Sequence, residues 1–187
     1  MWRRIFRDAV LLSLLACATA HADSWAPPGV QVKASESGEH LVRVEPGRRA
    51  QDPPRAVLYR HDAGSESYLR RIAYALPQRA APVDVLLADD GTLVALDAWA
   101  QVGRGIVVTV HDATGETKRS YTLQALLGKA AAAAAPSSVS STWWRCGKPA
   151  LIAGGRVLRV VTHDESELRI GLRDGKVEYE RGSSRCR

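Results

Sequence analysis

The stretch "VDVLLADDGTLVALDAW" (Val83–Trp99) has the pattern of a β-hairpin, because two apolar, strand-forming runs flank the turn Asp90-Gly91. Tight turns that contain glycine between two such runs are typical of antiparallel strands. The segment that follows, "GIVVTVHDATGETKRSYTL" (Gly105–Leu123), repeats this design around a turn that begins at His111-Asp112. The sequence therefore predicts four consecutive antiparallel strands in this part of the chain.

The same order of strands and turns occurs once before. "VQVKASESGEHLVRVE" (Val30–Glu45) aligns with the stretch from Val83, and "AVLYRHDAGSESYLRRIAYAL" (Ala56–Leu76) aligns with the stretch from Ile106. A four-stranded unit that recurs about every 50 residues has the spacing of propeller blades or of a stacked β-meander. A third unit can be phased on His163-Asp164 or on "LRDGK" (172–176), and both alternatives remain open.

We predict a single all-β domain over residues 23–187, made of repeated antiparallel four-stranded units in a partial propeller-like or β-sandwich-like arrangement. The only helical pattern lies near 123–135, where Leu123–Leu127 is followed closely by six alanines and then by Pro136. We interpret the low-complexity stretch 128–142 as helix extension followed by a loop.

The segments "DDGTLVALDAW" and "GIVVTVHDATGETKRSYTL" resemble bacterial exported β-propeller-type repeat proteins, and the resemblance covers residues 30–123. It implies a β-propeller-like fold. Closed propellers of this kind have four or more blades, whereas this chain offers two clear units and a third that is less defined. A partial propeller could associate with a second copy of the chain, so a homo-oligomer is one possible assembly.

The N-terminus has the features of a secretory signal peptide at residues 1–22: three arginines, the apolar stretch Ala9–Ala18 and the small-residue exit Ala20-His21-Ala22. An alternative is a lipoprotein signal that ends before Cys17, since "LLAC" resembles a lipobox and would give a lipid anchor through Cys17. Both alternatives predict export, either to the periplasm or medium or to a membrane as a lipoprotein.

Two cysteines, Cys146 and Cys186, remain after cleavage at Ala22, and we expect them to form a disulfide in an oxidising compartment. Removal of three arginines and one aspartate with the signal lowers the net charge from +6 to +4. No basic stripe interleaved with aromatic residues is present, so we do not expect nucleic acid as a partner.

Three of the five histidines directly precede an aspartate: His61-Asp62, His111-Asp112 and His163-Asp164. One hypothesis makes these pairs ligands of zinc or a similar metal. We favour turns, because adjacent residues on a strand point to opposite faces and chelate poorly. Each aspartate would then accept backbone N–H groups, with Gly64 and Gly115 at positive φ. We expect no cofactor.

The tryptophans are candidates for binding. Trp143, Trp144 and Arg145 follow the low-complexity stretch and form our candidate binding residues, since tryptophan is enriched in binding sites. The alternative, which we favour for the two tryptophans, is that they fill the core, with Trp144 near the disulfide. We expect Trp99 to fill the core. The sequence is best interpreted as an exported cell-envelope binding or scaffolding module without catalytic activity, with an unknown protein or an envelope glycan as partner. The alternative is a periplasmic hydrolase or lyase that uses His111 and Asp112.

Overall fold

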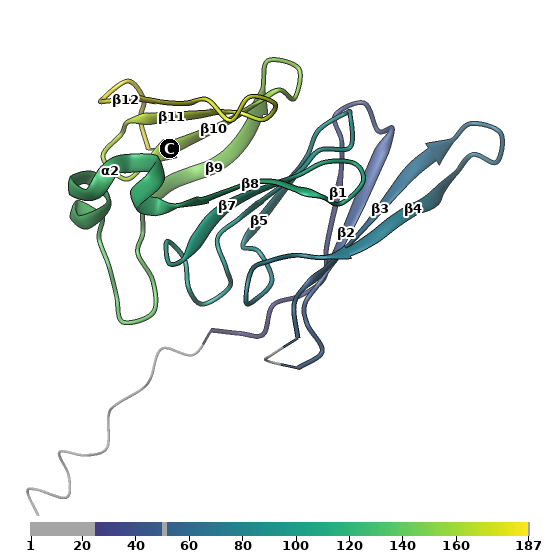
Figure 1. Ribbon diagram of the computed structural model, residues 1–187, viewed down its shortest axis with the longest axis horizontal. Helices are drawn as coiled ribbons and strands as arrows, with labels where there is room; N and C mark the ends of the chain where they lie inside the picture. Colours follow the sequence, from purple (N-terminus) through teal and green to yellow (C-terminus); the bar gives the residue numbers. More distant parts are fainter. Residues whose placement is uncertain (1–24, 50–51, 187) are drawn as a thin grey trace, which may run out of the picture.

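The computed structural model describes residues 25–49 and 52–186, and it consists of three four-stranded antiparallel sheets and one helix (Figure 1). Each sheet is a meander of four consecutive strands, so the prediction of an all-β chain of repeated four-stranded units is confirmed. Sheet 1 contains β1 (Gln31–Ala34), β2 (His40–Glu45), β3 (Arg55–Asp62) and β4 (Ser67–Ala75). Sheet 2 contains β5 (Asp84–Leu87), β6 (Leu93–Leu96), β7 (Ile106–His111) and β8 (Thr117–Thr122). Sheet 3 contains β9 (Arg145–Ile152), β10 (Val157–Thr162), β11 (Glu167–Gly171) and β12 (Val177–Glu180).

The sheets follow one another in space in the order of the chain. Their first strands adjoin, with β1 against β5 and β5 against β9. Sheet 2 consequently lies between the other two, as Figure 1 shows. All four residues of β6 are buried, which is the pattern of a strand that is covered on both faces.

Two apolar clusters fill the spaces between the sheets. One joins sheets 1 and 2 and includes Val42, Leu58 and Leu93. The other joins sheets 2 and 3 and includes Leu96 and the fully buried Trp144. The two clusters therefore lie on opposite faces of the middle sheet. The β3–β4 hairpin projects away from them (Figure 1).

Helix α2 (Leu123–Ala134) covers the core between sheets 2 and 3. The hydroxyl of Thr122 accepts a hydrogen bond from the backbone N–H of Ala125 and caps the first turn, as threonine commonly does. The leucines of the first turns are buried, and the backbone then departs from helical geometry at Gly128 (φ 79°, ψ 163°). The helix thus includes the alanines of the low-complexity stretch up to Ala134, and the loop follows it.

Both predicted phases of the third unit, on His163-Asp164 and on residues 172–176, are wrong. Sheet 3 starts at Arg145 with a strand, β9, that the sequence did not reveal. His163-Asp164 therefore lies in the second turn of its sheet, whereas His61-Asp62 and His111-Asp112 lie at the third turn of theirs. The sequence did not reveal β9 because Gly147 (φ 70°) and Pro149 interrupt its strand pattern.

The predicted disulfide between Cys146 and Cys186 is present, with the two Cα atoms 5.4 Å apart. It ties the segment after β12 to the beginning of β9. The proposed signal peptide and Cys17 lie outside the described residues. In the ranges that the structure describes, no helix combines the length and the apolar character that crossing a membrane requires.

Candidate functional site

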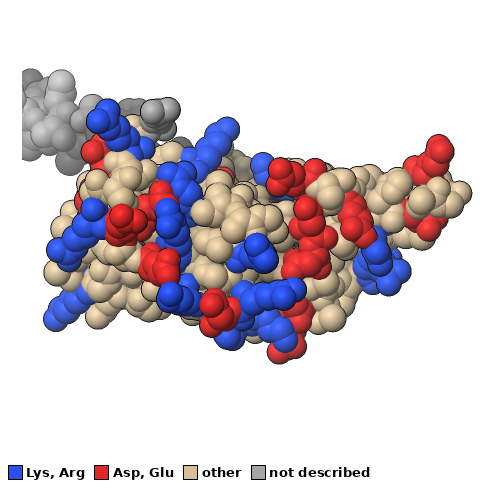
Figure 2. Space-filling model, turned by 90° about the horizontal axis from the view of Figure 1, so that it is seen from above, with Lys and Arg blue, Asp and Glu red and all other residues tan. Residues whose placement is uncertain are grey.

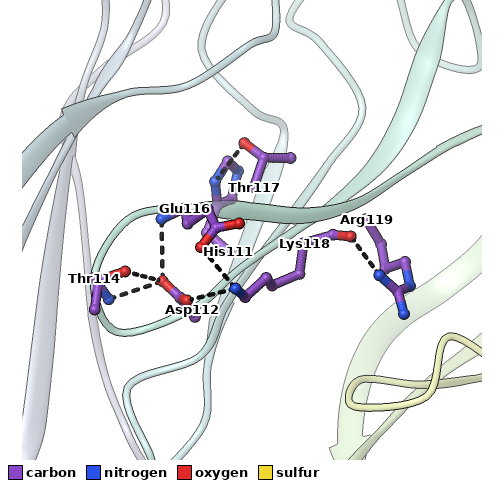
Figure 3. Close-up of polar contacts among 7 residues, drawn as sticks. All are labelled: His111, Asp112, Thr114, Glu116, Thr117, Lys118 and Arg119. Atoms are coloured by element: carbon purple, nitrogen blue, oxygen red, sulfur yellow. Dashed lines mark hydrogen bonds and ion pairs between the residues drawn. The ribbon is translucent and has the colours of Figure 1, made fainter.

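The His111-Asp112 pair forms a turn between β7 and β8, as predicted (Figure 3). One carboxylate oxygen of Asp112 accepts hydrogen bonds from the backbone N–H groups of Thr114 (2.9 Å) and Glu116 (3.0 Å) and from the Thr114 hydroxyl (2.6 Å). The Thr114 hydroxyl, with Lys118 and these N–H groups, lowers the pKa of Asp112 to about 2. Gly115 has the predicted positive φ of 81°. The carboxylate of Asp112 is therefore engaged in holding the turn.

The other two pairs also hold turns, with different details. Asp62 accepts hydrogen bonds from the backbone N–H and the hydroxyl of Ser65, which lower its pKa. In this turn Glu66 has the positive φ (51°), so the prediction of a positive φ at Gly64 is wrong. The left-handed residue of this turn therefore lies directly before β4.

At the third pair, Asp164 accepts hydrogen bonds from the hydroxyls of Thr162 (2.6 Å) and Tyr179 (2.8 Å). Burial acts to raise its pKa, but these hydroxyls and Ser166 outweigh burial and lower the pKa to about 2. The three His-Asp pairs belong to three different sheets and are not brought together. Over residues 25–49 and 52–186, no group of three or more His, Cys, Asp or Glu side chains is arranged to hold a metal ion.

The imidazole of His111 is fully buried. Its Nε2 lies 3.1 Å from the hydroxyl of Thr109, and its Nδ1 lies 3.2 Å from the hydroxyl of Thr117. Burial lowers the pKa of His111 and favours the neutral ring. The amide nitrogen of Gln78 donates to the same Thr109 hydroxyl (2.8 Å), which extends the polar chain outward from the histidine. In this arrangement His111 presents no surface to a substrate in solution.

The candidate binding residues Trp143, Trp144 and Arg145 are divided between the interior and the surface. Trp144 is fully buried, and its indole N–H donates to Asp97 (2.8 Å). The guanidinium of Arg145 donates to Asp97 (2.9 Å) and to Asp84 (2.6 Å). Trp144 and Arg145 thereby join sheet 3 to sheet 2, and only Trp143 is exposed, with 47% of its surface accessible.

The β6–β7 loop, residues 97–105, has an unusual backbone. Asp97 (φ 57°) and Ala100 (φ 60°) both occupy the left-handed region, which non-glycine residues rarely adopt. The loop is held in this shape because Asp97, fully buried, also accepts the N–H of Gly103 (2.9 Å). Strained backbone of this kind is concentrated at functional sites. The β6–β7 loop is therefore the first part of our candidate site.

Three tryptophans from distant parts of the chain meet beside this loop, and we call them the tryptophan cluster: Trp25, Trp99 and Trp143. Trp25 stacks on Trp143 with ring centroids 6.2 Å apart and an angle of 14°, and it meets Trp99 edge-on at 5.4 Å. The indole N–H of Trp99 donates to the carbonyl of Ala26 (2.7 Å), which fixes the segment before β1. Trp99 is only half-buried, so the prediction that it fills the core is wrong.

The tryptophan cluster lies where the loop after α2 and the segment before β1 come together, on the lower side of Figure 1. The loop after α2 is attached to the β6–β7 loop, because the N–H of Thr142 donates to the carbonyl of Val102 (2.8 Å). The guanidinium of Arg104 also donates to the carbonyl of Ser138 (3.0 Å). Sequence reasoning missed Trp25, since nothing in the sequence connects it to Trp143.

A cavity of about 400 Å³ opens next to the same loop, and we call it the loop cavity. Its walls come from the β4–β5 connection and from the β6–β7 loop. The polar side chains that line it are Gln78, Arg79, Gln101 and Arg104. On the upper face of the molecule, positive and negative side chains are interspersed (Figure 2).

Comparison with known proteins found no relationship: no protein-family model matches the chain, and no curated protein matches its sequence.

Proposed function

We propose that this protein is an exported, non-catalytic binding module of the bacterial cell envelope, and that it binds a glycan through the tryptophan cluster. The observation that carries the proposal is the exposed indole of Trp143, which is held flat against Trp25 at the meeting point of three loops. A rigid aromatic surface of this kind can stack on the apolar face of a sugar ring at little cost in conformational entropy.

The size of the apolar surface favours a sugar over a protein partner. In the loop after α2, Trp143 and Val139 are the large apolar residues that are exposed. Stable protein–protein interfaces bury about 800 Å² on each partner and have a well-packed apolar centre. One exposed indole and one exposed valine provide less apolar surface than such an interface needs, and the indole suits a ligand that is narrow and rich in hydroxyl groups.

Export is supported by two features of the chain. The N-terminal segment has the pattern of a signal peptide, and the disulfide between Cys146 and Cys186 is of the kind that persists in oxidising compartments. Our proposed location is the periplasm or the cell surface, with a lipid anchor through Cys17 as the alternative form.

The resemblance to exported β-propeller-type proteins remains part of the proposal. The succession of four-stranded meanders whose first strands adjoin is consistent with a partial propeller of three blades. In such an arrangement the connections at one end of the blades form the ligand-binding surface. The tryptophan cluster occupies connections of this type.

Affinity electrophoresis tests the proposal: the purified protein is run through gels that contain neutral or acidic polysaccharides, and it is also sedimented with isolated cell-wall sacculi. We expect at least one glycan to retard or co-sediment the protein, and Trp143→Ala to abolish this effect. The matched control is Val139→Ala, which removes an almost fully exposed apolar residue of the same loop. Absence of binding to every glycan, or equal binding by the Trp143 variant, would contradict the proposal.

A further inference from the structure

Sheet 1 has an apolar face that lies outside both apolar clusters, and we call it the outer face of sheet 1. Side chains alternate between the two faces of a strand, and Val42 and Leu58 point toward sheet 2 as members of one cluster. The register of the strands assigns these apolar residues to the opposite face: Val32, Ala34, Leu41, Val57, Tyr59 and Ala73. Among the described residues, none of these six belongs to either apolar cluster. Sheet 1 lies at one end of the row of sheets (Figure 1).

The equivalent positions of sheet 2 are buried against sheet 1. When the two sheets are aligned on the residue pairs that close their first hairpins, Val32 corresponds to Val85. In the same alignment Leu41 corresponds to Leu93. Val85 and Leu93 are at most 1% exposed and belong to the cluster that joins the two sheets, whereas Val32 is 54% exposed. Sheet 1 therefore has a face of the kind that receives a neighbouring four-stranded sheet.

The other end of the row is the face of sheet 3 that points away from sheet 2, and we call it the outer face of sheet 3. A cavity of about 360 Å³ opens on it, and Ile152, Val157 and Glu178 are among the residues that line this cavity. The C-terminal tail covers the opposite end of this face, near Cys146 and Val161. The part of the outer face around Ile152 and Val157 is thus free to contact another sheet.

The charges on the two outer faces are complementary. Arginines outnumber glutamates on the outer face of sheet 1, where the register places Arg43, Glu45, Arg55 and Arg70. Glutamates outnumber arginines on the outer face of sheet 3, where it places Arg159, Glu167, Arg169, Glu178 and Glu180. Contact between two copies of the same face would bring like charges together, whereas contact between the two different faces brings opposite charges together.

We propose that the outer face of sheet 1 binds the outer face of sheet 3 of a second copy of this chain. A two-fold axis forms both contacts at once and closes six sheets into a ring. The new contact continues the packing of sheet 1 on sheet 2 and of sheet 2 on sheet 3, and six blades lie within the range of closed propellers, roughly four to eight. The described segment before β1 leads away from this face, because Trp25 is held in the tryptophan cluster.

Analytical ultracentrifugation of the whole mature protein with its disulfide intact tests the proposal. We expect a species with twice the mass of the mature chain. Val32→Asp should weaken this association by about tenfold or more, because the contact would bury an unpaired charge. Val139→Asp is the matched control, since this valine is 97% exposed in the loop after α2, and it should associate as the parent does. A protein that is monomeric at every concentration, or a dimer that Val32→Asp does not weaken, would overturn the inference.

A mixture of two variants tests which faces meet. Val32→Asp and Val157→Asp should each weaken both contacts of the dimer, whereas a mixed pair keeps one intact contact. We therefore expect the mixture to recover part of the dimer. Glu178→Arg, at an exposed position of the same outer face, replaces Val157→Asp if circular dichroism shows that the latter is unfolded. A dimer that tolerates the sheet 3 variants, or a mixture that stays monomeric, would refute the contact between sheets 1 and 3.

This inference is independent of the proposed glycan binding. Trp143→Ala removes the proposed sugar contact and should leave the dimer intact, because Trp143 lies in the loop before β9 and on neither outer face. A dimer without glycan binding would refute the proposed function alone. Glycan binding by a monomer would refute the dimer alone.

Discussion

Asp97 connects the β6–β7 loop to the residues that begin sheet 3. It is fully buried at a left-handed φ of 57°, and its carboxylate accepts hydrogen bonds from Trp144, Arg145 and Gly103. It therefore fixes the β6–β7 loop and holds the beginning of sheet 3 against sheet 2. Removing one partner of a buried ion pair is strongly destabilising, because it leaves the other charge buried without compensation.

We predict that Asp97→Ala lowers the free energy of unfolding by about 3–5 kcal/mol, because it leaves the guanidinium of Arg145 and the indole N–H of Trp144 without their buried partner. Asp97→Asn keeps one accepting oxygen and tolerates the left-handed backbone angle, so it should lower the free energy of unfolding by less than Asp97→Ala does. Urea denaturation followed by tryptophan fluorescence measures both. A loss below about 1 kcal/mol for the alanine variant would contradict the role given to this carboxylate.

Single residues were predictable where their role is local. The carboxylates of Asp62 and Asp112 accept hydrogen bonds from residues of their own turns, and the sequence shows both the aspartates and these donors. Asp97 and Trp25 were missed because their partners lie far away in the chain, as in the hydrogen bond between Asp97 and Trp144. Burial of Trp144 and exposure of Trp143 likewise depend on the position of β9.

Secondary-structure elements were likewise predictable where local sequence determines them. Strands with regular apolar residues and glycine turns were found close to their observed bounds, as were the helix start and its leucine-rich face. β9 was missed because Gly147 and Pro149 break its pattern, and its pairing with β10 is irregular between Arg159 and Val161. In β9, tertiary pairing overrides weak local preference.

At the level of elements, helix α2 gives the second prediction. Alanine is the best helix former, yet Gly128→Ala should lower the free energy of unfolding by about 1–3 kcal/mol, because φ 79° and ψ 163° form a conformation that is almost restricted to glycine. Thermal unfolding followed by circular dichroism measures the change. Ala133→Gly, at an exposed position of the same helix, is the comparison and should cost about 1 kcal/mol. Higher stability in Gly128→Ala would show that the helix can straighten.

For the whole molecule, the number of strands per unit and the antiparallel order followed from the sequence, whereas the phase of the third unit did not. Two units repeat closely enough to align, but sheet 3 shares only its four-stranded plan with them. The tryptophan cluster and the loop cavity arise only when the sheets are placed side by side. They are properties of the assembled fold, and no local pattern predicts them.

The disulfide gives the third prediction, at the scale of the whole chain. It closes a loop of 40 residues that contains all four strands of sheet 3. In the chain-entropy model, replacing Cys146 and Cys186 together by serine lowers the free energy of unfolding by about 3–4 kcal/mol. Guanidinium denaturation of the oxidised protein, the reduced protein and the double variant measures it. Equal midpoints for all three would contradict this contribution.

The same bond determines how the molecule responds to mechanical tension. When the chain is stretched from its two ends, force that enters near Cys186 crosses the sulfur bridge to Cys146 and bypasses everything between them. Sheet 3 is thereby protected from the applied force, which acts on the hairpins of sheets 1 and 2 until their strands separate. A protein tethered at one end to an envelope and at the other to a polymer would extend by a shorter length than its residue count allows, and would keep its last sheet folded throughout.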